Sequence, residues 1–152
     1  MTDTDKERQS TFKEYKQIEQ VFCPYLKTKV VFNSGGFRHL IYKAGNKKRD
    51  PSSMKIRFKM LSNAVTVLKI TTTLQEYQSE TKELPIKEYG QKVDKITTVV
   101  YFGFIAIIND WKIKVIVKKI GQGKPFFWSV IPNWVTSPKR DKVFHKGSLE
   151  ED

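Results

Sequence analysis

The last third of the chain decides the fold, because residues 96–134 read ITTVVYFGFIAIINDWKIKVIVKKIGQGKPFFWSVIPNW. Apolar and β-branched side chains dominate three segments of this stretch, and turn-forming residues separate them. The pattern predicts three strands, at Ile96–Asn109, Trp111–Ile120 and Phe126–Trp134. Short connections between consecutive strands are typical of antiparallel hairpins. We therefore expect an antiparallel sheet in this part of the chain.

Three segments upstream of these strands have the apolar spacing of helices, at Thr11–Phe22, Phe37–Ala44 and Lys55–Ile70. A short β-branched run at Thr28–Phe32 predicts one more strand. Residues 76–94 are mixed in character, with several acids, a proline and a glycine, and indicate an irregular connection. Helices followed by strands indicate an α+β fold, with N-terminal helices packed on a roughly four-stranded antiparallel β-sheet.

The length and composition fit one domain over residues 1–152. Hydrophobic residues make up 39% of the chain, which is enough for a buried core and too much for a disordered protein. The single cysteine, Cys23, excludes an intramolecular disulfide and a cysteine-rich zinc site. The polar start lacks a signal peptide, and the longest apolar run, Val99–Ile108, is too short to span a bilayer. We expect a cytoplasmic protein without a membrane partner, metal or cofactor.

Positive charge is concentrated in two parts of the chain. Lys and Arg total 28 against 16 Asp and Glu, a formal net charge of +12. Residues 38–59 carry eight basic side chains and one acid, and residues 112–124 carry five basic side chains and no acid. A segregated positive face favours an anionic partner, of which nucleic acid is the commonest. The alternatives are a solvated surface and, less well supported, an anionic membrane surface.

A histidine and a lysine share one side of the helix expected at Phe37–Ala44. His39 and Lys43 are four residues apart, so they lie together and away from the apolar stripe of that helix. A neighbouring cation lowers the pKa of a histidine below its usual value of about 6.5. Because a general base must be neutral at neutral pH, His39 is a candidate base. A surface histidine, or one satisfied within the fold, is the simpler alternative.

The strand expected at Trp111–Ile120 carries lysines on both faces. Side chains alternate along a strand, so Lys112, Lys114 and Lys118 share one face and Lys119 takes the other. Such a strand contributes several cations to one face of the sheet, where phosphates would bind in a salt-dependent manner.

Ser129 lies among large apolar side chains in the next expected strand. Alternation places it on the face of Phe127 and Ile131. A buried serine needs a hydrogen-bond partner, which a phosphate oxygen or a neighbouring backbone carbonyl would supply. Trp128 directly precedes the serine, and a slip of one residue would turn Ser129 to the other face.

The order of these features resembles a known nuclease family. The pattern Val-x-Phe…Gly-Phe-x-His-Leu-Ile-x-Lys at residues 31–43 is followed by Arg49 and Arg57. A lysine-bearing strand, a glycine turn and Phe-Phe-x-Ser at residues 126–129 come next. This order looks like the phage-associated nucleases grouped with barnase, EndoU, the tRNA-cutting colicins and RelE. The resemblance covers residues 28–133, leaving 1–27 as an N-terminal helix and 135–152 as a polar C-terminal tail.

The resemblance implies helices packed on a four-stranded antiparallel sheet and cleavage of RNA without a metal. In that chemistry the ribose 2′-hydroxyl attacks the adjacent phosphate, leaving a 2′,3′-cyclic phosphate and a free 5′-hydroxyl. By the same resemblance, His39 is the acid–base residue and Ser129 binds a phosphate oxygen. Charge on the phosphate would be stabilised by Lys43, Arg57 and Lys118. The positive face would add nucleic-acid contacts from Arg38, Arg49, Lys112, Lys114 and Lys119.

Several partners and one alternative function fit the same features. A transfer or messenger RNA would be the substrate of a toxin or mobile-element effector, and an acidic antitoxin or immunity protein would mask the positive face. The histidine-pair version of this chemistry needs a second histidine, and His145 lies in the polar tail. A lysine or water would then donate the proton. The alternative function is a non-catalytic RNA- or DNA-binding module on the same fold.

Overall fold

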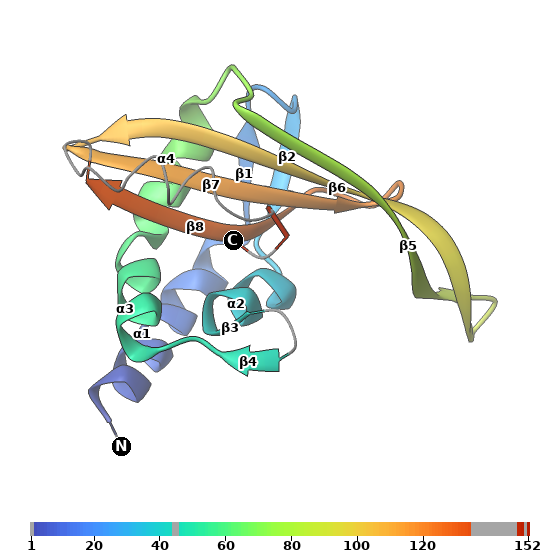
Figure 1. Ribbon diagram of the computed structural model, residues 1–152, viewed down its shortest axis with the longest axis horizontal. Coiled ribbons are helices and arrows are strands. Elements are labelled where there is room, and N and C mark those ends of the chain that lie inside the picture. The colour runs from blue at the N-terminus through green and yellow to red at the C-terminus, as the bar shows by residue number, and fades with distance from the viewer. Residues whose placement is uncertain (1, 44–45, 135–148, 151) are drawn as a thin grey trace.

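The computed structural model describes residues 2–43, 46–134, 149–150 and 152. These residues form an α+β fold in which four helices pack beside a mixed six-stranded sheet of order β1-β2-β8-β7-β6-β5 (Figure 1). The helices are α1 (Asp3–Ile18), α2 (Ser34–Ile41), α3 (Pro51–Lys59) and α4 (Leu61–Ile70). The strands of the sheet are β1 (Gln20–Cys23), β2 (Thr28–Val31), β5 (Glu76–Glu88), β6 (Gln91–Ile108), β7 (Trp111–Ile120) and β8 (Phe126–Trp134). A separate pair consists of β3 (Tyr42–Lys43) and β4 (Lys47–Lys48).

The sheet has more strands than predicted and is not wholly antiparallel. β5, β6, β7 and β8 pair in antiparallel fashion, as their short connections require. β1 and β2 form a hairpin that extends the sheet, and β2 joins β8 in parallel where Val31 meets Phe126. The prediction of a four-stranded antiparallel sheet is therefore wrong. The order of helices before strands is also incomplete, because β1 to β4 alternate with the helices along the chain.

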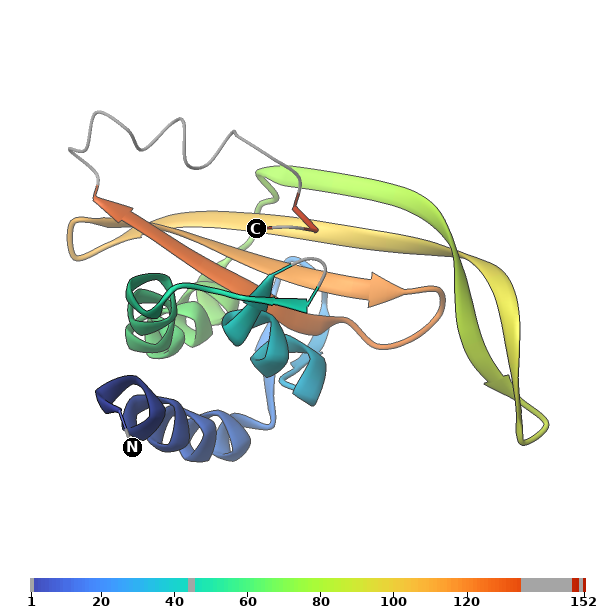
Figure 2. The same ribbon diagram turned by 60° about the horizontal axis from the view of Figure 1, so that its bottom comes forward.

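Residues 76–94, predicted as an irregular connection, form most of a long β-hairpin. β5 pairs with β6 over its whole length. Pro85 is tolerated because β5 is the edge strand, where one side has no ladder hydrogen bonds to lose. Tyr89 and Gly90 form the turn with φ angles of 50° and 79°, which suit a tight two-residue hairpin. The end of this hairpin extends beyond the other strands as an arm (Figure 2).

Local capping moves the first helix away from its predicted place at residues 11–22. Thr2 and Asp5 form a capping box that satisfies free amides of the first turn, so α1 begins much earlier in the chain. Glu19 then takes a φ of 59°, which ends the helix and lets the chain continue as β1. Phe22, predicted as the last residue of this helix, is exposed on β1 instead.

The later helices also differ in extent from their predictions. A side-chain cap at Asn33 starts α2 before the predicted residue. The helix ends at Ile41, so Lys43 stands on β3 and not on the helix. The helix predicted at residues 55–70 is two helices, because the backbone departs from helical geometry at Met60 with a ψ of 3°.

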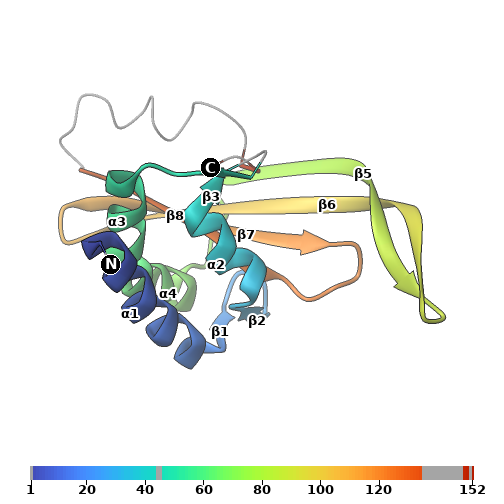
Figure 3. The same cartoon turned by 90° about the horizontal axis from the view of Figure 1, so that it is seen from below.

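Two apolar clusters lie on opposite faces of the sheet. The larger joins the helices to the sheet, with Phe37 and Phe58 packing near Val115 and Phe127. The smaller lies on the other face and consists of Val99, Tyr101, Ile116, Ile131 and Leu149. Figure 3 shows α1 and α4 below the sheet and the C-terminal residue on its upper side. No helix in the described ranges is long and apolar enough to cross a membrane.

Candidate functional site

The close approach of α2 to β8 creates the site. β2 pairs with β8 near the start of that strand, and α2 packs against β8 beyond that point. Gly36 permits the contact, since a Cβ there would stand 2.1 Å from the main-chain oxygen of Phe127. The Tyr15 hydroxyl donates a 2.6 Å hydrogen bond to the main-chain oxygen of Asn33 and holds the start of α2. α2 therefore lies close enough to β8 for its polar side chains to contact side chains of that strand.

A β-bulge in β8 sets the directions of Trp128 and Ser129. Phe127 pairs with Val117 and Ser129 pairs with Ile116, so Trp128 is the additional residue of the bulge. Directly paired residues point to the same face of a sheet, which puts Phe127 with the helices and Ser129 with Ile116 on the other face. The prediction that Ser129 shares a face with Phe127 is wrong because of this bulge.

His39 is buried between Trp128 and Arg49. Its ring stacks on the Trp128 indole, with centroids 4.0 Å apart and planes at 17°. Arg49 Nη2 lies 3.1 Å from His39 Nε2. Because a guanidinium only donates, this pattern assigns Nε2 as the acceptor and the proton to Nδ1. Burial, and then the charges of Arg49, Arg57 and Lys118, lower the pKa of His39 to about 2, so the imidazole is neutral at neutral pH.

Arg57 and Ser129 together bind one oxygen beside this histidine. Arg57 reaches from α3 to β8, where its Nη1 donates to Ser129 Oγ. Both side chains also donate to the main-chain oxygen of Asp152, at 2.7 Å from Arg57 Nη1 and 2.9 Å from Ser129 Oγ. Burial, and then the nearby Arg49, lower the pKa of Arg57 to about 9, which leaves it protonated at neutral pH. The pair thus directs a charged and a neutral donor at one oxygen atom, an arrangement that suits an anion.

Lys114 adds a second buried cation to the same region. Its side chain is 0% exposed, and Nζ lies 3.1 Å from Glu76 Oε2 and 3.0 Å from Asp152 Oδ2. Burial raises the pKa of the Asp152 carboxyl, and the ion pair with Lys114 opposes this rise. Lys114, predicted to contact nucleic acid, is therefore engaged by carboxylates within the protein.

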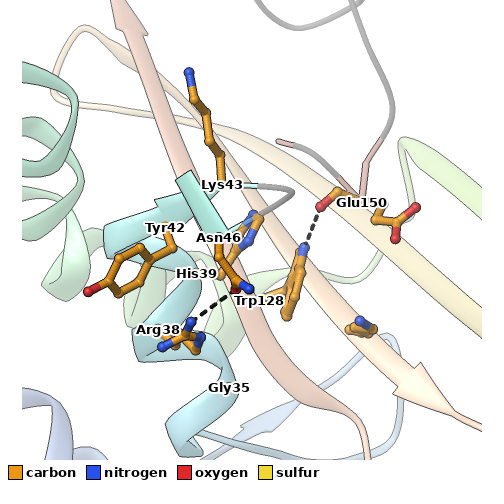
Figure 4. A pocket seen from close by; sticks show the side chains of 9 residues that line it. Gly35, Arg38, His39, Tyr42, Lys43, Asn46, Trp128 and Glu150 are labelled. Carbon is orange, nitrogen blue, oxygen red and sulfur yellow. Dashed lines mark hydrogen bonds between the residues drawn. The ribbon is translucent and has the colours of Figure 1, made fainter. Parts of the chain in front are cut away.

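An open pocket of about 400 Å³ lies beside the His39 ring (Figure 4). Trp128, Lys118 and Glu150 form part of its wall. Lys118 Nζ lies 4.0 Å from the centre of the Trp128 ring, a cation–π contact, and burial lowers the pKa of this lysine. On the rim, Arg38 donates a 3.0 Å hydrogen bond to Asn46 Oδ1. The pocket thus combines cations, an aromatic surface and a neutral imidazole.

The structure brings five of the predicted site residues together through these contacts: His39, Arg49, Arg57, Lys118 and Ser129. Arg38 and Lys43 line the pocket, but Lys43 stands on β3 and points away from the two rings (Figure 4). The lowered histidine pKa agrees with the prediction in direction, but Lys43 is not among its causes.

Other predicted residues lie outside the pocket. Lys119 lies on the helix-bearing face of the sheet, in a different hollow beside Tyr77. Lys112 is half-buried on β7, opposite Ile107 of β6. His145 lies outside the described residues. The cationic face on the sheet is therefore smaller than the sequence suggests.

Sequence reasoning missed three residues of the site: Trp128, Glu150 and Asp152. Trp128 was noted only as the residue before Ser129 and was given no role in the site. Residues 135–152 were interpreted as a polar tail, yet Leu149 is buried, and Glu150 and Asp152 accept hydrogen bonds from Trp128 and Ser129 of β8. A leucine directly before three acids is the sequence signal for this docking.

The donor groups of the site suit anions. Arg, Lys and Ser donors converge on it, and no three His, Cys, Asp or Glu side chains within the described parts of the chain are placed to hold a metal ion. Comparison with known proteins found no matching family model, no matching curated protein and no matching solved structure.

Proposed function

We propose that this protein is a metal-independent ribonuclease, which cleaves RNA by attack of the ribose 2′-hydroxyl on the adjacent phosphate. One observation carries the proposal: His39 and Lys118 line one pocket, and Arg57, whose charge acts on His39, is hydrogen-bonded to Ser129 beside it. A histidine that only fills a core does not require three cations around it. A site that stabilises a phosphorane does require them.

Each group has a role in the two halves of the reaction. Neutral His39 accepts the proton of the 2′-hydroxyl as the 2′-oxygen bonds to phosphorus. Arg57 and Ser129 donate hydrogen bonds to the non-bridging oxygens, where negative charge increases. The Lys118 ammonium, with a pKa lowered by burial, gives a proton to the 5′-oxygen as the old phosphorus–oxygen bond breaks. The products are a 2′,3′-cyclic phosphate and a 5′-hydroxyl.

His39 needs one rearrangement before it can act as the base. Nε2 accepts a hydrogen bond from Arg49 and Nδ1 carries the proton, so no lone pair is available. A phosphate in the pocket would attract the Arg49 guanidinium and release Nε2. The negative charge of that phosphate would also raise the pKa of His39 toward its ordinary value, which improves the base.

The test is cleavage of an end-labelled RNA of mixed sequence in EDTA, followed by analysis of the product ends. We expect 2′,3′-cyclic phosphate ends from the wild type and a rate at least about 100-fold lower for His39→Gln. Glutamine keeps an acceptor for Arg49, and binding of an uncleavable RNA should survive the change. The matched control is Lys119→Gln, on the other face of the sheet, which should cleave at the wild-type rate.

Two results would overturn the ribonuclease assignment. One is equal cleavage by the wild type and His39→Gln, which would point to a contaminating nuclease. The other is the absence of cyclic-phosphate ends from any RNA tested, with both the full chain and a chain that ends at Leu149.

A non-catalytic RNA-binding module on the same fold is the second candidate. The occupied lone pair of His39 favours it, because such a histidine can hold Arg49 in place without moving a proton. This candidate predicts salt-sensitive RNA binding with no product, and equal RNA affinity for the wild type and His39→Gln.

A further inference from the structure

Leu149, Glu150 and Asp152 are bound to the sheet on the side opposite the helices. Leu149 is buried in the smaller apolar cluster, and its amide donates to Gln78 Oε1 at 2.8 Å. The Trp128 indole N–H donates to the main-chain oxygen of Glu150 at 2.9 Å (Figure 4). The Glu150 carboxylate accepts a hydrogen bond from Lys82. Both ends of the described segment are therefore held by specific contacts.

Asp152 occupies the anion-binding groups of the candidate site. Its main-chain oxygen accepts from Arg57 and Ser129, and Arg49 Nη2 lies 3.5 Å away. Its side chain accepts from Lys114. These donors include both groups that the proposed reaction assigns to the non-bridging phosphate oxygens. An RNA phosphate cannot reach Arg57 and Ser129 while Asp152 holds them.

We propose that Glu150 and Asp152 act as an intramolecular competitor of RNA, which closes the phosphate site until these two residues are displaced. The identity of the excluded ligand rests on the proposed function, whereas the occupancy rests on the contacts alone. The carboxylates of Glu150 and Asp152 both accept hydrogen bonds from lysines, as an anionic ligand would. RNA and this segment compete for the same charged donors.

Leu149 and the two acidic residues are held by different kinds of contact. Leu149 is held by apolar packing and by its bond to Gln78, which do not depend on charge. Glu150 and Asp152 are held by salt bridges and charge-assisted hydrogen bonds, which weaken when another anion competes or when the salt concentration rises. The acidic residues can therefore leave the site while Leu149 stays in place.

The experiment compares the full chain with a chain that ends at Leu149, using fluorescence anisotropy. The probe is a labelled 2′-O-methyl RNA, which lacks the attacking hydroxyl and cannot be cleaved. If the segment occupies the site about 90% of the time, the shortened chain should bind about tenfold more tightly. An acetylated Leu-Glu-Glu-Asp peptide added in trans should reverse the gain.

A charge-matched variant excludes a general electrostatic effect. Glu14→Gln, Glu19→Gln and Glu83→Gln together remove three exposed acids that do not line the pocket, as the truncation removes three acids. This triple variant should gain clearly less affinity than the truncation. Equal affinities for the truncated chain and the triple variant would overturn the proposal.

A full-length double variant, Glu150→Gln with Asp152→Asn, covers the case in which truncation unfolds the protein. It keeps the main-chain contacts and the side-chain volumes and should give an intermediate gain. No gain in this folded variant would also overturn the proposal. Binding is measured separately from cleavage, so the two proposals can fail independently. Tighter RNA binding by the truncated chain with no cyclic-phosphate product would refute the ribonuclease function and support the proposed competition. Cleavage by both chains with equal RNA affinities would support the ribonuclease function and refute the proposed competition.

Discussion

Replacing Gly36 with alanine should destabilise the fold and disturb the site, whereas the same change at the neighbouring Gly35 should be tolerated. A Cβ at Gly36 would stand 2.1 Å from the main-chain oxygen of Phe127 and 2.7 Å from the Tyr15 hydroxyl. Ordinary contact begins at 3.4 Å, so α2 would have to withdraw from β8 by about 1.3 Å (3.4 − 2.1). That movement would separate the stacked rings of the site, because α2 carries the histidine and β8 the tryptophan.

The expected loss follows from three terms. Overpacking against a backbone atom costs about 1–3 kcal/mol. Loss of the Tyr15 hydrogen bond to Asn33 costs about 1 kcal/mol. Alanine in place of glycine within a helix stabilises the folded state by about 0.5–1 kcal/mol. The net change for Gly36→Ala is a destabilisation of roughly 1–3.5 kcal/mol, with a central value of about 2 kcal/mol.

Gly35 is the matched control, since it lies one position earlier in the same helix. A Cβ there would meet only the Asn33 side chain, at 3.3 Å, and the Phe126 side chain, at 3.8 Å. Gly35→Ala should therefore change the free energy of unfolding by less than about 1 kcal/mol.

The assay is urea unfolding followed by tryptophan fluorescence. With a slope of about 2 kcal/mol/M, Gly36→Ala should lower the urea midpoint by about 1 M or more. Its melting temperature should fall by roughly 5–10 °C. Equal midpoints for Gly36→Ala and the wild type would show that α2 is not held against β8 as described. Equal losses for both glycine variants would show that helix propensity, not the close contact, controls stability.

Three further predictions concern charge. Folding lowers the pKa of His39 from 6.5 to about 2, so the unfolded chain binds more protons below about pH 6.5. The contribution of His39 to the free energy of unfolding is therefore complete above pH 6.5 and falls by roughly 2 kcal/mol by about pH 5. In His39→Gln the free energy of unfolding, measured by urea titration, should depend less steeply on pH. Lys114→Met removes the buried cation that faces Glu76 and Asp152, which should destabilise the protein by about 3–5 kcal/mol at neutral pH. The loss should be smaller in acid, because the carboxyls are then neutral. Calorimetry at both pH values tests this prediction. Arg38→Ala, at the pocket rim, should reduce the slope of log affinity for uncleavable RNA against log salt by about 0.7, as measured by anisotropy.

Each of these three predictions has a contradicting result. An unchanged pH slope in His39→Gln would mean that the imidazole is not the buried neutral group. A loss for Lys114→Met that is the same in acid would assign the effect to packing rather than to charge. An unchanged salt slope for Arg38→Ala would place the RNA elsewhere on the protein.

The sheet illustrates which structural features the sequence could predict. Strands β7 and β8 were predictable because alternation and tight turns are local properties. Strand β5 was not, because its acids and Pro85 resemble a loop, and only pairing with β6 at the sheet edge makes them a strand.

The site illustrates the same limit. His39 and Ser129 were identifiable as chemically unusual residues within apolar segments. Their geometry was not predictable, since the bulge at Trp128 depends on a shift against β7. The contact of Asp152 with Arg57 joins residues far apart in the chain, which no local pattern encodes.

By itself, the sequence determined the α+β class, the strands of residues 96–134 and the excess of positive charge. These depend on periodicity, turn residues and composition, which act over a few residues. The tertiary structure decided which cations meet around His39, which face Ser129 occupies and where the acidic end of the chain lies. These depend on the close approach of α2 to β8, on one bulge and on buried ion pairs, whose energies exist only when distant segments are in contact.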